Sequence, residues 1–491
     1  MNKKEGKHLF QDYKPEVGVY DELFSQDGMP YPEVSSVVSL LNKVSATDFI
    51  EKQLFVDASF LQSGITFTVY ADDSGTEKIF PFDLIPRIIS ESEWDGLEKG
   101  LAQRLKALNC FLNDIYSDQE IIEAGVIPRD LIETSEEYLP QMRGVTPPGG
   151  VYCHIAGLDL IKDENGFMVL EDNVRTPSGV SYVLENRNNL KRVLPDVFSR
   201  SNVRRVANYP MQLRKALNEL SPRQEIDGVS IKGMTVVLTP GQYNSAYFEH
   251  GYLARKMGCE LVNGSDLFIH ENYVYLKTTK GPKLVTVIYR RIDDPFLDPE
   301  FFNPESMLGV PGLMQVYKAG NVVLANAVGN GIADDKAVYP YVHEMIRYYL
   351  DEEPLLAQVK TFFCHEEKDR GYVLKNLDKL VIKETNGSGG YGMLIGPQAS
   401  QEERDEFAKK ITDNPRGYIA QPLIELSTSP TFLDNKVVPR RVDLRAFLVT
   451  GKTTWVMPGG LARVALTEGS YVVNSSQGGG SKDAWVLGGT K

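Results

Sequence analysis

Two strand-like runs between His154 and Gly179 carry side chains of the kind that bind a hard metal ion. The runs flank a KDENG turn, which would place Asp159 on one strand near Glu171 and Asn173 on the next. Because side chains two apart on a strand share a face, Glu171 and Asn173 would point the same way. Carboxylate and amide oxygens suit Mg²⁺. A hairpin with a solvated acidic rim is the alternative interpretation.

A turn with a cation and a hydroxyl group follows directly. Arg175 and Ser178 lie in the run RTPSG, beside backbone amides that the turn would expose. Such a loop could hold an anion as negative charge develops on it.

The segment VIKETNGSGGYGM (381–393) combines one lysine with a glycine-rich turn. A strand would deliver Lys383, and the glycines from Gly387 to Gly392 would let the backbone approach a ligand closely. One lysine and glycine amides suit a polyphosphate. The run is neither a Walker A loop nor a GxGxxG fingerprint opening a helix. A plain flexible hairpin explains the glycines equally well.

Two further segments concentrate charge. ANAVGNGIADDKAVYPYV (325–342) places Lys336 after two aspartates, which could also form an N-cap with acids matched to the helix dipole. Later, Arg441, Asp443 and Arg445 would share one strand face, with Arg463 on another strand-like run. They could bind carboxylate and phosphate, or form an exposed salt-bridged stripe.

The elements that must position these groups divide the chain into four predicted regions. Leucines from Leu97 onward recur on one helical face, and MTVVLTP, SAYFEHGYLARKMG and LVTVIYRRID alternate strand and helix later on. Strands outweigh helices near the end, so the predicted class is α+β with an α/β subdomain. The regions are an N-terminal arm and α+β region (1–150), metal-site strands and helix (151–225), a small α/β subdomain (226–350) and the lid with the C-terminal core (351–491).

The composition narrows the class of protein. The 491 residues include 53 basic and 66 acidic ones, a formal charge of −13, which disfavours nucleic acid and anionic membranes as partners. Four scattered cysteines without a CxxC pair fit a reducing compartment. We find neither a signal peptide nor a run of eighteen apolar residues, and therefore expect a cytoplasmic protein.

Taken in order, the motifs resemble the circularly permuted ATP-grasp family. The resemblance is strongest to its bacterial type 2 proteins, which are related to glutathionylspermidine synthase and glutathione synthetase. The motifs that carry it are LEDNVRTPSGVSYVLENR, ADDKAVYPYV, GSGGYGM and VNSSQGGGSKDAWVL.

The resemblance implies a role for each candidate residue. It implies a magnesium site at Asp159, Glu171 and Asn173, and catalytic roles for Arg463, Arg175 and Ser178. It implies ATP binding by Lys336, Lys383, Gly387, Ser388, Gly389, Gly390, Tyr391, Gln421, Leu423 and Arg445. By the same resemblance, Gln421 and Leu423 would lie in the hinge beside adenine, and Gly387 to Gly392 would form the lid over the phosphates.

The resemblance also implies an activity. The expected enzyme is an ATP- and Mg²⁺-dependent ligase that joins a small-molecule or peptide carboxylate to an amine through an acyl phosphate. Two departures stand out: Asn386 replaces a carboxylate that often precedes the lid glycines, and Gly157 replaces an arginine, for which Arg175 or His154 would have to substitute. A non-catalytic nucleotide-binding protein and a phosphotransferase of the same fold are the alternatives. The substrates and the oligomeric state stay open.

Overall fold

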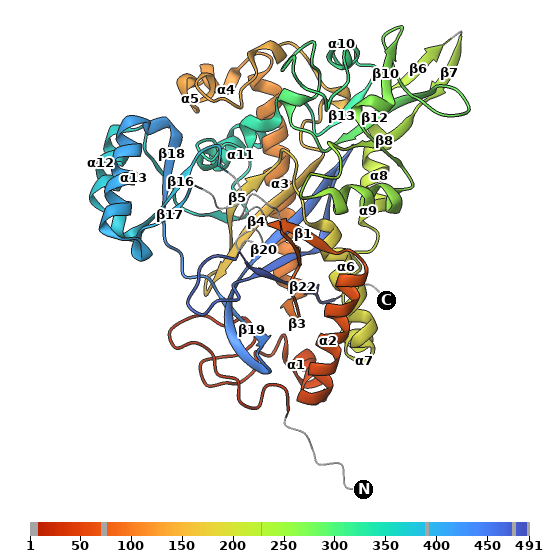
Figure 1. Cartoon of the computed structure of the whole chain (residues 1–491). Helices are drawn as coiled ribbons and strands as arrows, with labels where there is room; N and C mark the ends of the chain where they lie inside the picture. Colours follow the sequence, from red (N-terminus) through yellow and green to blue (C-terminus); the bar gives the residue numbers. More distant parts are fainter. Residues whose placement is uncertain (1–7, 70–75, 227, 388–391, 474–477, 489–491) are drawn as a thin grey trace.

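A mixed eight-stranded sheet forms the centre of the molecule (Figure 1). The computed structural model describes residues 8–69, 76–226, 228–387, 392–473 and 478–488. Along the sheet the strands are β14 (Ala357–Gln358), β5 (Gly166–Asn173), β4 (Ile155–Asp163), β20 (Lys436–Thr450), β21 (Thr454–Val464), β22 (Gly480–Val486) and β3 (Phe82–Ile89), with β19 (Thr428–Leu433) paired to β20. The pairs from β5 to β22 are antiparallel, and the outer pairs β14–β5 and β22–β3 are parallel.

Side chains of β20 alternate between two apolar layers. Leu444, Ala446 and Leu448 join the core that contains helix α3 (Glu91–Ile115). Phe447 belongs to the opposite core, formed with helices α6 (Val180–Val193), α7 (Pro195–Arg200) and α8 (Tyr209–Leu220). The sheet is therefore covered on both faces, and polar side chains on β20 face the α6 side with Phe447.

Helix α3 confirms the predicted helical periodicity. Ser90 and Glu93 form a capping box at its start. The predicted face is buried along its length, at Leu97, Leu101, Leu105, Leu108, Leu112 and Ile115.

The predicted strand–helix–strand segment forms a second sheet with six strands. Helix α9 (Tyr247–Met257) ends at Gly258, whose φ of 65° is a left-handed conformation that glycine adopts readily. The strands are β10 (Leu267–His270), β11 (Tyr273–Leu276), β12 (Lys283–Arg290), β8 (Met234–Leu238), β9 (Glu260–Val262) and β13 (Val323–Ala325). The predicted strands at β8 and β12 and the predicted helix between them are confirmed.

A four-stranded antiparallel sheet with two helices lies at the left of Figure 1. Ser400 and Glu403 form a capping box at the start of α13. The elements are β15 (Phe362–Phe363), β18 (Tyr418–Pro422), β16 (Leu380–Glu384), β17 (Leu394–Ile395), α12 (Glu367–Lys375) and α13 (Gln401–Asp413).

The N-terminal segment lies on the larger body, as predicted. Its extended part precedes the helices α1 (Ser35–Leu41) and α2 (Ala46–Gln62). Glu22 of this segment is buried and pairs with Arg87 of β3 at 2.5 Å. The strands that follow, β1 (Thr66–Val69) and β2 (Thr76–Ile79), form an antiparallel pair, and the residues between them lie outside the described ranges.

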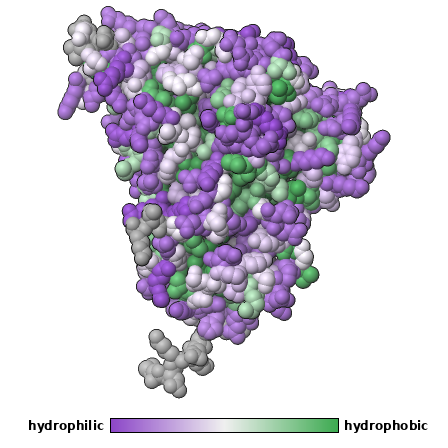
Figure 2. Space-filling view, turned by 180° about the vertical axis from the view of Figure 1, so that it is seen from behind, coloured by the Kyte–Doolittle hydropathy of each residue, from purple (hydrophilic) through white to green (hydrophobic). Residues whose placement is uncertain are grey.

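Short elements complete the chain, and the mixture of helices and sheets confirms the predicted α+β class. They are α4 (Glu120–Glu123), α5 (Arg129–Glu133), β6 (Arg223–Ile226), β7 (Val229–Lys232), α10 (Leu313–Lys318) and α11 (Val342–Leu350). The predicted domain boundaries stay a prediction. Within the described ranges no helix is long and apolar enough to cross a membrane. Figure 2 shows a face that is largely hydrophilic, with hydrophobic residues in separate patches.

Candidate functional site

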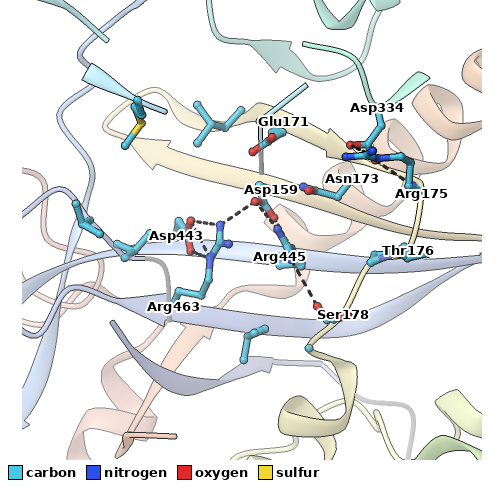
Figure 3. Close-up of a pocket in the computed structure, with 18 of the residues that line it drawn as sticks. Asp159, Glu171, Asn173, Arg175, Thr176, Ser178, Asp334, Asp443, Arg445 and Arg463 are labelled. Atoms are coloured by element: carbon cyan, nitrogen blue, oxygen red, sulfur yellow. Dashed lines mark hydrogen bonds and ion pairs between the residues drawn. The ribbon is translucent and has the colours of Figure 1, made fainter. Parts of the chain in front are cut away.

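A cavity of about 590 Å³ collects most of the predicted site residues. This volume is in the range of small-molecule sites. The predicted residues that line it are Asp159, Glu171, Asn173, Arg175, Ser178, Lys336, Lys383, Gly387, Arg445 and Arg463 (Figure 3).

The predicted pairing of the metal-site strands is confirmed. Asp159 of β4 lies opposite Glu171 of β5, and Gly157 lies opposite Asn173. The register shifts after Asp159, because Leu160 pairs with Val169 and leaves Leu170 as an extra residue on β5. Consequently Leu170 and Glu171, although adjacent in sequence, both line the cavity.

Asp159 is bound by two arginines from neighbouring strands. Arg445 donates to both of its oxygens, from Nε at 2.7 Å and from Nη2 at 2.8 Å, and Arg463 donates at 2.9 Å. Burial alone would raise the pKa of Asp159, but the charges of Arg445 and Arg463 outweigh it and lower the pKa to about 2. Asp159 is therefore ionised at neutral pH.

Arg441 and Asp443 of β20 are buried and Arg445 is half-buried, so the exposed-stripe interpretation is wrong. Asp443 is 1% exposed and accepts from Arg463 Nε at 2.8 Å. Arg441 is 6% exposed, pairs with Glu425 at 2.5 Å and does not line the cavity. Figure 3 shows Arg463 between Asp443 and Asp159.

Two lysines meet beside Glu171. Lys336 Nζ lies 2.7 Å from Glu171 and also donates to the carbonyl oxygen of Gly387. Lys383 has no hydrogen-bond partner among the described residues, and burial, together with the charge of Lys336, lowers its pKa although Glu171 opposes the shift. Burial raises the pKa of Glu171, but Lys336 and Lys383 outweigh it and hold the pKa below its ordinary value.

The aspartates before Lys336 do not cap a helix, so the N-cap interpretation is wrong. The next α-helix, α11, begins at Val342. Asp334 instead accepts from the backbone N–H groups of Val174 and Arg175, at 2.7 and 2.9 Å, and Asp335 pairs with Arg416 at 2.5 Å. These tertiary contacts tie the lysine segment to the end of β5.

Two asparagines of the same segment hold the other side of that backbone. Asn326 donates from its amide to Val174 O and Arg175 O, at 2.6 and 2.9 Å, and Asn330 also donates to Val174 O. Arg175 is paired with Glu137 at 2.7 Å. The position of Arg175 in the cavity wall is therefore fixed through its backbone and its side chain.

The turn before α6 exposes fewer amides than expected. The N–H groups of Gly179 and Ser181 both donate to Glu249 of α9, at 2.8 and 2.9 Å. An internal carboxylate thus occupies this helix N-terminus, where an anion would otherwise be favoured. Ser178 still lines the cavity.

The remaining predicted residues have different positions. Gln421 is 2% exposed and lines a small adjoining cavity together with Lys336 and Lys383. Leu423 is half-buried and lines neither cavity. The calls on Ser388, Gly389, Gly390 and Tyr391 lie outside the described residues.

The structure shows what surrounds Gly157 and Asn386, the two positions that depart from the resembled family. A Cβ on Gly157 would lie 3.3 Å from Cδ of Arg445, so that side chain covers the glycine. His154 is fully buried and does not line the cavity, so it is not a substitute for the missing arginine, whereas Arg175 does line it. Asn386 Nδ2 lies 3.4 Å from Glu136.

Sequence reasoning missed several residues of this site. Glu249 and Asp293 line the cavity, and Leu170 enters it through the bulge. Glu249 lies in an amphipathic helix pattern, and nothing local in that pattern distinguishes it from a surface acid. The presence of an acid beside the polar turn follows from the tertiary fold.

The donor set on β4 and β5 fits Mg²⁺ by its chemistry. It offers two carboxylates and one amide, and the Asn173 Nδ2 atom is buried with no hydrogen-bond partner in the described part of the chain. Within the described ranges no group of three Asp, Glu, His or Cys side chains could hold a metal ion. Any ion here would therefore rely on the amide oxygen, and would share Asp159 with its arginines and Glu171 with Lys336.

Comparisons with known families and sequences give matches over most of this chain. The family described as "Circularly permuted ATP-grasp type 2" matches residues 86–465. An "Uncharacterized protein" of Synechocystis sp. is 52% identical over 482 residues, covering 98% of this chain and 99% of the relative. A Frankia casuarinae protein named "Putative glutamate--cysteine ligase 2-2" is 38% identical, and the match covers 97% of this chain but 54% of that protein.

One solved structure shows the same fold. It is a glutathione synthetase-like effector from Globodera pallida in its apo form, with a TM-score of 0.58 and 11% sequence identity. The match covers 90% of this chain and 98% of the effector.

Proposed function

The chain belongs to the circularly permuted ATP-grasp type 2 family, which confirms the resemblance of the motifs, and from this premise we propose its reaction. We propose that it is an ATP- and Mg²⁺-dependent ligase that joins a carboxylate to an amine through an acyl phosphate. A glutathionylspermidine synthase-like specificity has no support from the relatives, so both substrates are left as chemical classes.

The meeting of Lys336 and Lys383 beside Glu171 is the observation that carries the proposal. Two ammonium groups in one cavity, one without a hydrogen-bond partner among the described residues, suit the oxygens of a polyphosphate. The carboxylate and amide oxygens of β4 and β5 lie on the same wall.

An apolar group of the same cavity would receive the adenine ring. Ile161, Leu426 and Val473 line the cavity and belong to one cluster, and Leu170 packs against them. Gln421 lines the adjoining cavity with Leu170, and its buried Oε1 has no hydrogen-bond partner among the residues that the structure describes. This supports the hinge role expected for Gln421, whereas Leu423 would act through its backbone.

Asp159, Glu171 and Asn173 would hold the magnesium ion. When bound, Mg²⁺ would offset negative charge on phosphate oxygens and orient them. Arg445 and Arg463 keep Asp159 ionised and fixed in place, and Lys336 does the same for Glu171.

The reaction would proceed in two steps. A carboxylate oxygen of the acid attacks the γ-phosphorus of ATP, the bond to the β-phosphate oxygen breaks, and Lys336 and Lys383 stabilise the phosphate charge. The amine then attacks the acyl carbon, phosphate leaves, and the amine nitrogen loses a proton. Arg463 and Arg175 would stabilise the oxyanion, and positioning supplies most of the acceleration.

The test is ADP release in the presence of ATP and Mg²⁺, screened over amino acids, short peptides and polyamines as pairs. Glutamate and cysteine enter the screen because the name of the Frankia relative contains them. The Glu171→Ala protein is the control for contaminating ATPases. We expect ADP release that requires an acid, with an amide product of matching mass when an amine is added.

Two other outcomes point to the alternatives. ATP binding without ADP release under any pair would support a non-catalytic nucleotide-binding protein. A phosphorylated product that never reacts with an amine would support a phosphotransferase. Product mass spectrometry separates these results.

A further inference from the structure

Arg291 reaches the polar turn from the other sheet. It directly follows β12, is 6% exposed, and is not among the described residues that line the cavity. Its Nη1 donates to Pro177 O at 2.9 Å, and its Nη2 donates to Ser178 Oγ. A residue of the six-stranded sheet therefore fixes a side chain in the wall of the cavity.

The contact sets the direction of the Ser178 hydroxyl. A guanidinium has donors and no acceptor, so Ser178 Oγ must accept from Arg291. The hydroxyl hydrogen then points away from Arg291. Because Ser178 lines the cavity, this hydrogen can be donated to an oxygen atom inside it.

Three backbone positions of the turn offer no free N–H group to a ligand. Pro177 has no N–H, and the N–H groups of Gly179 and Ser181 donate to Glu249. The amide of Arg175 donates to Asp334 at 2.9 Å. The Ser178 hydroxyl, like that of Thr176, lines the cavity, and Arg291 fixes the direction of the Ser178 hydroxyl.

Arg291 is itself held in place. It donates to the hydroxyl oxygen of Tyr289 at 3.0 Å and lies 3.6 Å from Oε1 of Glu249. Glu249 in turn binds the backbone on the α6 side of the same turn. Arg291 therefore binds the turn at Pro177 and Ser178, Glu249 binds it at Gly179, and the two side chains lie close to each other.

We infer that Arg291 is a positioning residue, which orients the Ser178 hydroxyl as a hydrogen-bond donor to the phosphoryl group that ATP transfers. This inference rests on the proposed function, since it assigns the ligand oxygen to the terminal phosphate. It goes beyond that function because it assigns to Arg291, which does not line the cavity, an effect on the binding of the terminal phosphate.

The test compares AMP-PNP with ADP, because AMP-PNP has the terminal phosphate and ADP lacks it. The Kd of each is measured by titration calorimetry with Mg²⁺ for the wild type, Ser178→Ala, Arg291→Lys and the double variant. We expect each single variant to lose about tenfold of the preference for AMP-PNP, as for one charge-assisted hydrogen bond. The double variant should lose no more than Ser178→Ala alone.

Arg187→Lys is the matched control, since Arg187 is 2% exposed and pairs with Asp483 at 2.6 Å, outside the turn. It should leave the preference unchanged. If Arg291→Lys does not fold, Tyr289→Phe replaces it, because this change removes one contact of Arg291 and should lower the preference when Ser178 is present.

Two results would overturn the inference. One is an Arg291→Lys effect of equal size with and without Ser178, and the other is an unchanged preference for AMP-PNP. Absence of binding of both nucleotides to the wild type would instead remove the proposed function itself, and this inference with it.

Discussion

Lys336 Nζ lies 2.7 Å from the carboxylate of Glu171 and also donates to Gly387 O. One ammonium group thus joins the end of β5, the segment before α11 and the glycine-rich turn. In the proposed reaction a phosphate oxygen would compete with Gly387 for this group. The neighbouring Lys383 would bind phosphate with less competition, which makes it the sharper target for mutation.

Lys383→Met should separate ATP binding from stability. The side chain is half-buried and its ammonium has no hydrogen-bond partner among the described residues, so its removal should not lower the free energy of unfolding. The Kd for ATP should rise at least about tenfold. Calorimetry and urea unfolding give the two quantities, with the exposed Lys375→Met of α12 as control. An ATP affinity of Lys383→Met equal to that of the wild type would rule out Lys383 as a phosphate-binding residue.

ATP affinity should fall as pH rises through the lowered pKa of Lys383. Burial is the main cause of this lowering, and Lys336 adds to it. The positive charge that binds phosphate is present below that pKa and lost above it. Its loss therefore occurs at a lower pH than for an ordinary lysine, whose pKa is about 10.4. Lys383→Arg keeps its charge and should flatten the dependence. The check is the Kd of AMP-PNP against pH, and equal slopes in both proteins would refute the prediction.

The same shift has the opposite effect on folding. Because the folded-state pKa is lowered, the unfolded chain binds more protons between the two pKa values, and the contribution of Lys383 to stability rises with pH there. Denaturant unfolding across this range should give a larger free energy of unfolding for Lys383→Met than for the wild type, and this difference should shrink as pH increases. A constant difference would contradict the assigned direction.

Glu171→Gln should abolish the magnesium dependence of ADP release. The change removes a proposed metal ligand and the negative charge between two lysines, so turnover should fall at least about a hundredfold. ADP release is measured against Mg²⁺ concentration. Glu164→Gln, in the exposed turn between β4 and β5, is the matched control. An unaltered Mg²⁺ activation curve in Glu171→Gln would exclude Glu171 as a ligand.

Gly157→Ala should disturb Arg445. The added Cβ would lie 3.0 Å from Cβ of Pro177 and 3.3 Å from Cδ of Arg445, closer than ordinary packing. We expect the free energy of unfolding to fall by about 1–2 kcal/mol, with weaker ATP binding. Gly96→Ala on α3 meets nothing within 4 Å and should stabilise slightly. Urea unfolding that ranks the two variants in the reverse order would contradict this account.

Periodicity predicted the parts of the site that depend on local geometry. The shared face of Glu171 and Asn173 follows from the period of a strand, and the pairing with Asp159 follows from the short KDENG turn. The helix α3, the stop at Gly258 and the box at Ser400 are likewise local signals. Each could be predicted because neighbours in the sequence determine it.

Contacts between distant segments could not be predicted in this way. The ADDK run has the pattern of an N-cap, yet Asp334 binds the backbone after β5. The charges at Arg441 and Asp443 are compatible with a surface strand, and their burial depends on Glu425 and Arg463. Arg291 follows an ordinary strand pattern, and its partner Ser178 lies in the turn between β5 and α6. These roles arise when the sheets pack together.

The strand order of the central sheet has a consequence for synthesis of the chain. β3 is buried along its whole length and pairs in that sheet with β22, near the other end of the sequence. On the ribosome β3 emerges long before β22, so its backbone hydrogen-bonding groups and apolar side chains stay unpaired until the end of the chain is made. The nascent chain therefore exposes an aggregation-prone strand for most of translation, and the yield of folded protein in cells should depend on chaperones.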